Sequence, residues 1–454
     1  MILRPLLLAL FLGLTTSAAA APAALAPYHE PPWLVPRGAS PTLAYALLPD
    51  SATGTVYVRS DVRHSYTRIA LRRGTYCPGD PVDTAAMHRD KVCGSALLAR
   101  VPRSLTTGSK LIYYAVIRDH GRSVTVPTQR VWIVRSFEEV HLGTHRFGRI
   151  TPPDAIVART GPKGVGLTCC ADPPGGDGPS SLDIGRDGSI WVLDRLNHRL
   201  LVWSAGAPST PARSVALPTE LAVSDFALGR DGTIYVRAID TSQLGRGDKN
   251  HLYALTPAGK VRWQAPATSG IATAQLQLGP DGALYAVQGC AIGCAPFGGH
   301  VFWTPLTTPT GRPLSPAQRA NLRSPFEPLP GGLRLVTQVS FSVARFALID
   351  RADRVVRAWS VTSKTRMSGL AAAPALVGSD LLLPLEVSAR QHWEKLVVRL
   401  APSGLIRARV SLADRPLLGE VNLFAPLRLS SAGYLFQLRT SLDAGASVAS
   451  YVLR

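Results

Sequence analysis

Three histidines begin similar apolar stretches and are the first residues whose spacing suggests metal chemistry. His198 opens HRLLVW, His251 opens HLYALT and His300 opens HVFWTP. Imidazole is a common zinc ligand, so three of them on one surface could hold an ion. The simpler interpretation is that histidine packs at an equivalent place of a repeated unit. Strands at that place start too far from a shared axis to converge within ~2.1 Å of one ion. We therefore expect no bound metal and no cofactor.

Six cysteines form the second set with chemistry of its own, and they occur at Cys77, Cys93, Cys169, Cys170, Cys290 and Cys294. An even number in an exported chain favours disulfides over thiol catalysis or a four-cysteine zinc site. A bridge between the first two would close a loop without strand pattern. By the chain-entropy account it would contribute on the order of 3 kcal/mol.

The remaining four cysteines allow three pairings. The loop QGCAIGCAPFGG is short and glycine-rich, which favours Cys290 with Cys294. That choice leaves the adjacent Cys169 and Cys170 as a vicinal disulfide. Two cross-links between the two loops stay open as the alternative. A loop staple without a ligand is a simpler interpretation than a redox role.

A third set consists of polar residues that precede Asp-Gly pairs at fixed distances. The positions six and four residues before each pair are Ser181 and Asp183, Asp225 and Ala227, and Gln275 and Gln277. On innermost strands of a ring of sheets, such residues line a central channel, where ordered water is the plainest occupant. In a binding site they would form a hydrogen-bonding wall. The nearby acids Asp172, Asp177 and Asp194 could also hold calcium.

Familiar enzyme motifs are missing from the sequence. There is no GxSxG, no phosphate-binding glycine loop and no EF-hand loop. His29-Glu30 is followed by Pro31-Pro32 and does not form HExxH. A carboxylate pair for glycoside hydrolysis stays open, because it needs proximity in space rather than in sequence.

The elements that position these residues are repeated β-meanders. In PSSLDIGRDGSIWVLDRLNHRLLVWS (179–204), apolar residues alternate on both sides of a tight Asp-Gly turn. The turn at Asp187 recurs 44 residues later at Asp231, and again 50 residues after that at Asp281. Weaker copies follow near Gly331, Ser379 and Gly433. Six such units predict an all-β fold, a six-bladed β-propeller.

The two ends of the repeated region predict how the ring closes. The sixth unit ends after three strands, and DAIVART (154–160) is a strand without a partner in its own blade. We expect this segment to pair beside SVASYVLR (447–454) and so to remove an exposed edge.

The first unit resembles an NHL repeat in the residues Pro179, Asp187, Gly188, Asp194, Asn197, His198 and Arg199. The second and third units keep only the Asp-Gly turn, and LYALTPAGKVRW (252–263) resembles the blade motif of quinoprotein propellers. The NHL resemblance implies a propeller, and NHL-type lyases hold a metal with histidines. In quinoprotein dehydrogenases a vicinal disulfide faces the quinone. The gluconolactonase group has this fold with a Glu, Asn and Asp metal set that has no match here.

The two faces of such a propeller have different tasks. The Asp-Gly turns lie on one face, while the longer loops collect on the other, where propellers bind ligands over the axis. The candidate ligand-face residues are Asp172, Asp177, Ser181, Asp183, Asp194, Asn197, His198, Asp225, His251, Gln275, Gln277 and His300.

The rest of the chain divides into further segments. Residues 1–26, with Arg4 before an apolar run and then small residues, have the layout of a secretory signal peptide cleaved near Ala20. The run is shorter than the roughly 20 residues that span a bilayer. We expect a Pro-rich lead-in at 27–41, a β-sandwich at 42–135 that weakly resembles fibronectin type III or immunoglobulin-like modules, a linker at 136–153 and the propeller at 154–454.

The net charge of +19 comes mainly from arginines spread along the chain without a run. Arginine in place of lysine, with abundant Ala, Gly and Pro, is typical of GC-rich bacterial genomes. Nucleic acid is not an expected partner of an exported chain without a known binding module. We expect a secreted, non-catalytic protein without a transmembrane segment that binds a glycan, envelope polymer or protein. The alternatives are a metal- or cofactor-dependent propeller enzyme (lyase, lactonase or quinoprotein-like oxidoreductase) and a purely structural envelope protein.

Overall fold

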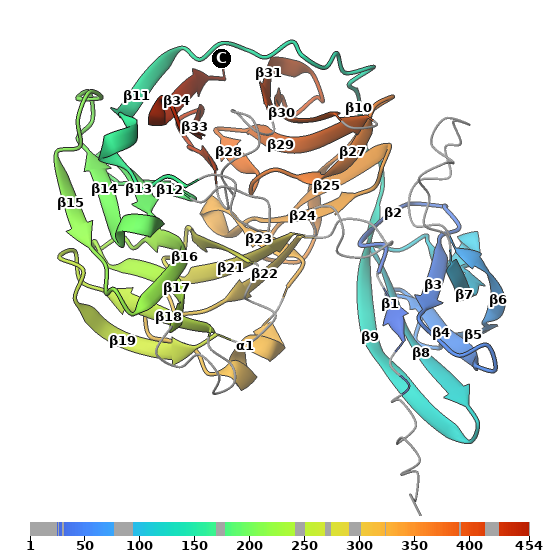
Figure 1. Cartoon of the computed structure of the whole chain (residues 1–454). Helices are drawn as coiled ribbons and strands as arrows, with labels where there is room; N and C mark the ends of the chain where they lie inside the picture. The colour runs from blue at the N-terminus through green and yellow to red at the C-terminus, as the bar shows by residue number, and fades with distance from the viewer. Residues whose placement is uncertain are drawn as a thin grey trace, which may run out of the picture.

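The fold consists of a small β-sandwich beside a ring of six sheets (Figure 1). The computed structural model describes residues 25, 27–29, 31–76, 94–168, 178–240, 250–267, 274–289, 301–322, 324–389, 392–413 and 426–453. The six expected cysteine positions, together with Asp172, Asp177 and His300, lie outside these residues.

Two sheets form the sandwich. The first has the order β1 (Tyr28–His29), β3 (Thr42–Ala46), β7 (Gly94–Arg100) and β6 (Arg72–Tyr76). The second has the order β2 (Leu34–Pro36), β9 (Arg122–Val134), β8 (Lys110–Asp119), β4 (Thr53–Ser60) and β5 (Thr67–Ala70). Alternate residues of β8, such as Tyr113 and Ile117, are buried against Leu97 and Leu43 of the other sheet.

The first three blades follow each other in sequence. Blade one contains β12 (Leu182–Ile184), β13 (Ile190–Asp194), β14 (Arg199–Trp203) and β15 (Arg213–Ala216). Blade two contains β16 (Leu221–Leu228), β17 (Ile234–Asp240), β18 (Asn250–Leu255) and β19 (Val261–Pro266). Blade three contains β20 (Gln275–Leu278), β21 (Leu284–Gly289) and β22 (Val301–Pro305), followed by helix α1 (Pro316–Leu322).

The last three blades complete the ring, and two of them take an outer strand from earlier in the chain. Blade four contains β23 (Phe326–Pro328), β24 (Arg334–Val339), β25 (Val343–Ile349), β26 (Val355–Thr362) and β10 (Glu138–His141). Blade five contains β27 (Arg366–Leu370), β28 (Ala375–Val377), β29 (Asp380–Ala389), β30 (His392–Leu400) and β31 (Ile406–Ala413). Blade six contains β32 (Leu427–Leu429), β33 (Tyr434–Ser441), β34 (Gly445–Val452) and β11 (Ala155–Thr160).

The Asp-Gly turns join the first two strands of blades one to three in the same way. Asp187 accepts hydrogen bonds from the backbone and the hydroxyl of Ser189, and Asp231 does the same for Thr233. The glycine after Asp187 has a φ of +78°, in the left-handed region that glycine adopts at least cost. The all-β propeller predicted from these turns is confirmed by the strand pairing.

The predicted closure of the ring is confirmed. β11 pairs antiparallel with β34, and Ala155 lies opposite Ser450. Gly445 begins β34 with a φ of +83°, and a Cβ there would lie 2.2 Å from the Thr160 carbonyl oxygen. Only a residue without a side chain fits this close approach, so Gly445 is part of the closure.

The expected linker at 136–153 includes a strand. β10 pairs in parallel with β26, so that Val140 lies opposite Val361. It covers the outer edge of blade four, which would otherwise expose unpaired backbone groups. The short EEVH stretch has no strong alternation, and its partner lies more than 200 residues away.

The sandwich rests on blade four. Trp132 of β9 contacts Phe326 edge-to-face, with ring centroids 4.9 Å apart, in an apolar cluster that also includes Leu34 and Val336. The Leu34 N–H donates to Gln338 Oε1 at 3.1 Å. Lys110 of β8 forms an ion pair with Asp353. Apolar and polar contacts together therefore join the two parts.

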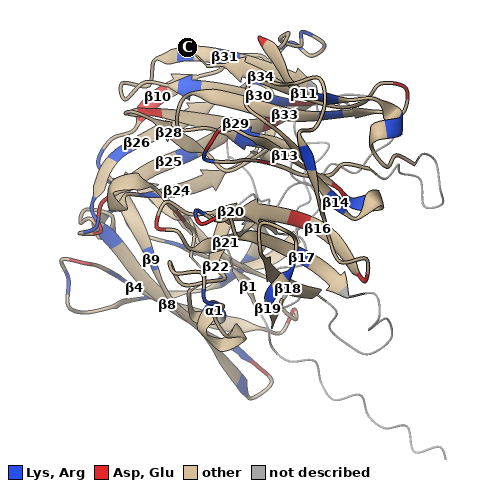
Figure 2. Cartoon of the chain, turned by 90° about the vertical axis from the view of Figure 1, so that its left-hand side faces the viewer, with Lys and Arg blue, Asp and Glu red and all other residues tan. Residues whose placement is uncertain are grey.

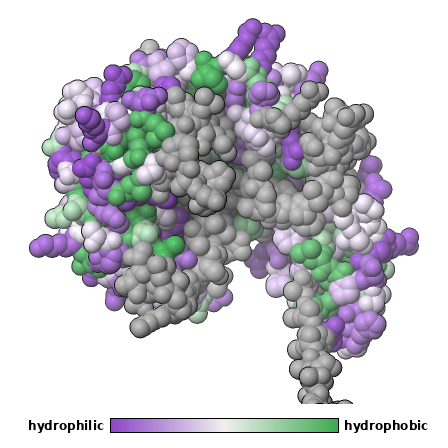
Figure 3. Space-filling model, in the orientation of Figure 1, coloured by the Kyte–Doolittle hydropathy of each residue, from purple (hydrophilic) through white to green (hydrophobic). Residues whose placement is uncertain are grey.

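Charged groups are scattered over the surface. In Figure 2, Lys and Arg are distributed over the blades rather than gathered in one stripe. Figure 3 shows hydrophilic side chains on the visible rims of both the propeller and the sandwich. No helix within the described ranges is long and apolar enough to span a bilayer.

Candidate functional site

The turn after the innermost strand identifies equivalent positions in five blades. In each, one backbone N–H donates to the carbonyl oxygen four residues later. These bonds are Gly185 to Ser189, Gly229 to Thr233, Gly279 to Ala283, Leu329 to Leu333 and Ser430 to Tyr434, at 2.7 to 2.8 Å. The residues two positions before these donors are Asp183, Ala227, Gln277, Glu327 and Arg428. The described part of the axial wall therefore carries charged or polar groups from four blades.

Asp183 links three blades at the axis. Its Oδ2 accepts the Leu228 N–H of blade two at 2.8 Å. Its Oδ1 lies 3.5 Å from Arg428 Nε of blade six, and the two side chains are 19% and 13% exposed. Both charges remain in partial contact with solvent, so a ligand on the axis could reach them.

Asp225 belongs to a fully buried pair. It lies directly opposite Arg237 on the neighbouring strand, and neither side chain is more than 1% exposed. Asp225 Oδ2 accepts the Leu276 N–H of blade three at 2.6 Å. Arg237 Nε donates to Ser224 Oγ at 2.9 Å, and its Nη1 donates to the Ala274 carbonyl.

Burial dominates the electrostatics of this pair. It raises the pKa of Asp225, while the charges of Arg428 and Arg237, the Leu276 N–H and the Ser181 hydroxyl act in the opposite direction. Burial also lowers the pKa of Arg237, against the attraction of Asp225. Asp225 thus joins blades two and three as Asp183 joins blades one and two.

The predicted polar wall is brought together in part. Ser181, Asp183 and Asp225 lie in this connected network. Gln275 and Gln277 flank Leu276, whose N–H binds Asp225 and whose carbonyl oxygen lies 3.4 Å from Arg428 Nη2. Asp183 and Asp225 therefore both bond neighbouring blades. Of these polar groups, Gln277 and the partly exposed Asp183–Arg428 pair are the ones that a ligand could reach.

Glu327 is the acidic member of the equivalent positions in blade four. Its side chain is 4% exposed, and its Oε2 has no hydrogen-bond partner among the described residues. Burial raises the pKa of Glu327 well above the usual value of 4.5. Burial on the innermost strand β23 therefore disfavours the charged form of this carboxyl group.

The Asp-Asn-Arg part of the NHL-like unit forms a separate structural cluster. Asp194 accepts from Gly166 N, Asn197 Nδ2 and Arg199 Nε, each at 2.9 Å. Arg199 also donates to the Gly164 carbonyl at 2.9 Å. Asp194 is fully buried, and these bonds tie the segment that enters blade one to the end of β13.

The two described histidines of the proposed trio lie in different settings. His198 has a φ of +47° and ends the short 3₁₀ turn Arg195–Asn197. His251 lies between Ala238 and Pro266 in blade two, with its ring 6.1 Å from that of Tyr253. Within the described ranges, no cluster of three or more His, Cys, Asp or Glu side chains could hold a metal ion.

Three axial residues were missed at the sequence level. Arg237 lies directly across from Asp225, one strand later. Glu327 and Arg428 stand four residues before the weak turns at Gly331 and Ala432, as Asp183 stands before Asp187. Extending the same count to the fourth and sixth units would have found both.

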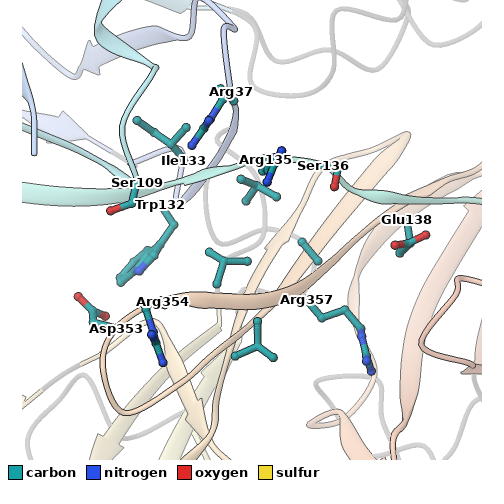
Figure 4. Close-up of a pocket in the computed structure, with 14 residues that line it drawn as sticks. Arg37, Ser109, Trp132, Ile133, Arg135, Ser136, Glu138, Asp353, Arg354 and Arg357 are labelled. Atoms are coloured by element: carbon teal, nitrogen blue, oxygen red, sulfur yellow. The ribbon is translucent and has the colours of Figure 1, made fainter. Parts of the chain in front are cut away.

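A cavity of about 370 Å³ lies between the sandwich and blade four (Figure 4). Its wall contains Arg37 and Arg135 from the sandwich side and Arg354 and Arg357 from the propeller side. These arginines are far apart in the sequence, and no pattern there predicts that they meet.

No protein family model and no curated protein matches the chain. Among solved structures, it is similar to a virginiamycin B lyase from Staphylococcus aureus (12% identity, 76% of this chain and 92% of that chain covered, TM-score 0.32). It is also similar to a PQQ-bound aldose sugar dehydrogenase from Streptomyces coelicolor (13%, 66% and 96%, 0.34) and to a putative gluconolactonase (15%, 68% and 97%, 0.31). At these TM-scores the similarities carry no argument, and the propeller fold rests on the strand pairing of the chain itself.

Proposed function

We propose that the protein is an exported, non-catalytic recognition protein, and that its propeller binds an extracellular glycan over the axis. The proposal combines the layout of a secretory signal in residues 1–26 with the polar wall of the innermost strands. In this proposal the polar wall recognises the ligand, and the carboxylates that bond neighbouring blades keep the ring stable.

The partly exposed Asp183–Arg428 pair is the observation that carries this proposal. A guanidinium donates hydrogen bonds and a carboxylate accepts them, so together they match hydroxyl groups, which do both. The pair is held by backbone bonds from neighbouring blades, so little ordering is needed on binding. Gln277 at the equivalent position of blade three adds an amide with both functions.

Binding of the mature protein to a panel of neutral and acidic polysaccharides, measured by calorimetry, tests the proposal. We expect Gln277→Ala to weaken binding of a recognised polysaccharide about tenfold, the loss of one to two hydrogen bonds. Arg186→Ala, which removes an exposed arginine of the Asp-Gly turn, is the control for a change of surface charge and should bind normally. Equal affinity of Gln277→Ala and wild type would remove the axial wall from the proposal.

The second candidate function is a metal- or cofactor-dependent propeller enzyme, and Glu327 favours it. A buried carboxyl with a raised pKa is the form in which a general acid is kept protonated. Metal analysis and an absorption spectrum of the purified protein discriminate between the two functions. A stoichiometric transition metal or a bound quinone chromophore would favour the enzyme.

Export is tested separately. We expect the protein recovered from outside the cell to begin near Pro22, after cleavage close to Ala20. N-terminal sequencing of that protein gives the answer, and an intact N-terminus on a cytoplasmic protein would contradict the proposal.

A further inference from the structure

We propose that the cavity between the sandwich and blade four binds an oxyanion, a phosphate or sulfate group. This site is separate from the axial wall, and it does not depend on the proposed glycan recognition. Guanidinium groups are suited to such ligands because their planar N–H donors can engage two oxygens at once.

Strand pairing places two arginines side by side at the cavity. β2 and β9 run in parallel with Pro36 opposite Val134, and Arg37 and Arg135 are the next residues of the two strands. The Arg37 N–H also donates to the Val134 carbonyl at 2.8 Å. Both side chains are exposed, so solvent screens part of the repulsion between the two cations, and an anion between them would remove the rest.

Neither of these guanidinium groups has a carboxylate partner among the described residues. Asp353 of the cavity wall is already paired with Lys110 and Arg334. Arg354 is paired with Asp350 at 2.8 Å. Glu138 is exposed and is the remaining carboxylate of the wall. The wall thus carries four arginines against two carboxylates.

The propeller side contributes lining residues but no guanidinium aimed at the sandwich. Arg357 of β26 is half-buried, and its guanidinium lies 5.9 Å from the centre of the Trp359 ring, on the side of β26 away from the sandwich (Figure 4). The charge of the cavity therefore comes mainly from Arg37 and Arg135, while residues of both parts of the molecule form its wall. An oxyanion bound here would contact the sandwich and blade four at the same time.

A buried donor also borders the cavity. Trp132 lines the cavity and is 5% exposed, and its Nε1–H has no acceptor among the described residues. Its ring projects from β9 toward the Asp353–Arg354 turn (Figure 4). The Nε1 atom itself is closed to solvent, so the ring has to turn toward the cavity before an oxyanion or its bound water can accept from it. A buried N–H without a partner is costly, which favours that contact.

The size of the cavity bears on what the oxyanion is attached to. Its volume of about 370 Å³ is roughly twelve times the ~30 Å³ that one water molecule occupies in the liquid. A bare phosphate would leave much of this space to water. The cavity has room for a phosphate or sulfate ester with part of its chain.

Thermal unfolding and calorimetry of the full mature chain test this site with inorganic phosphate, sulfate and glycerol phosphate, each compared with chloride at matched ionic strength. We expect phosphate or sulfate to raise the melting temperature relative to chloride. An ester that binds more tightly than inorganic phosphate identifies an esterified ligand, whereas equal affinities identify the free oxyanion. No stabilisation by any of the three would overturn the proposal.

Variants localise the effect. Arg135→Ala should weaken oxyanion binding at least tenfold, and Arg37→Ala with Arg135→Ala should abolish the stabilisation. Arg186→Ala, which removes an exposed arginine elsewhere, should leave it unchanged. Cooperative melting of the double variant in chloride, at or above the wild-type temperature, shows that it folds, and oxyanion binding as tight as in wild type would then reject the site.

Discussion

The axial charges and the junction charges differ in whether they are already satisfied. At the axis, Asp225 lies against Arg237, and Asp183 against Arg428 and the Leu228 N–H. At the junction, Arg37 and Arg135 follow two paired strands, and neither has a carboxylate partner among the described residues. The buried Asp225–Arg237 pair holds blades together, and the Asp183–Arg428 pair does so while staying partly exposed to a ligand. The junction arginines instead need an anion from outside to be compensated.

The largest effect is expected when the buried axial pair is broken. Asp225→Ala leaves the Arg237 guanidinium buried without its counter-charge and the Leu276 N–H without its acceptor. We expect a loss of about 3–5 kcal/mol in the free energy of unfolding. Denaturant titration followed by circular dichroism measures it.

Asp225→Asn is the matched control, because it keeps an acceptor for Leu276 while removing the charge. Its loss should be smaller than that of the alanine variant. If both variants are as stable as wild type, the Asp225–Arg237 pair does not hold the blades together. The comparison between compensated axial charges and uncompensated junction charges would then be wrong.

Glu327 gives the next largest effect and one that depends on pH. Because its folded-state pKa is raised, stability is complete below the usual carboxyl value of 4.5 and falls as pH rises above it. Glu327→Gln cannot ionise, so we expect it to be more stable than wild type at pH 7, by roughly 1–3 kcal/mol.

The extra stability of Glu327→Gln should vanish at pH 4, where wild-type Glu327 is protonated in both the folded and the unfolded state. Melting temperatures of the two proteins between pH 4 and pH 8 provide the measurement. Parallel profiles across that range would show that Glu327 is not the buried neutral acid of the axis.

Asp183 should have a smaller effect than Asp225, because solvent screens part of its charge. Asp183→Ala removes the acceptor of the Leu228 N–H, and we expect a loss of about 1–2 kcal/mol. Asp183→Asn, compared by the same denaturant titration, should recover part of it. A loss as large as that of Asp225→Ala would erase the distinction between the exposed and buried axial pairs.

The smallest effect is expected at the junction, and its sign is reversed. Arg135→Ala removes one of two adjacent cations, so in dilute chloride it should stabilise the protein by about 0.2–1 kcal/mol. The gain should disappear near 1 M salt, where the Debye length is about 3 Å. Thermal melts of Arg135→Ala and of the wild type at low and at high salt provide the comparison. A variant that is less stable than wild type at low salt would contradict like-charge repulsion.

The fold could be predicted from the turns in the sequence, whereas most of the charge pairing could not. The Asp187, Asp231 and Asp281 turns predicted blades because their geometry is local, and β11 was predicted to close the ring because it had no local partner. Glu327 and Arg428 escaped because their turns lack the Asp-Gly pair. The same four-residue count does reach them from the weak turns at Gly331 and Ala432, but only once those turns are known to be equivalent.

Non-local pairing explains the rest of what was missed. Arg37 and Arg135 become neighbours only through the parallel pairing of β2 with β9. β10 joins blade four across more than 200 residues. Asp194 additionally accepts the Gly166 N–H, 28 residues earlier in the chain, a contact that the spacing of the unit does not indicate. Residue type and spacing did not reveal which partner each group would find.

The pairing of β11 with β34 also sets an order of events during synthesis. β11 emerges early, directly before blade one, but its partner Gly445–Val452 is made nearly 300 residues later. The sandwich can fold as soon as β9 is complete, whereas the ring cannot close until the ribosome has released almost the whole chain. Such distant contacts slow folding. Until then the open ring exposes strand edges that could pair with other chains.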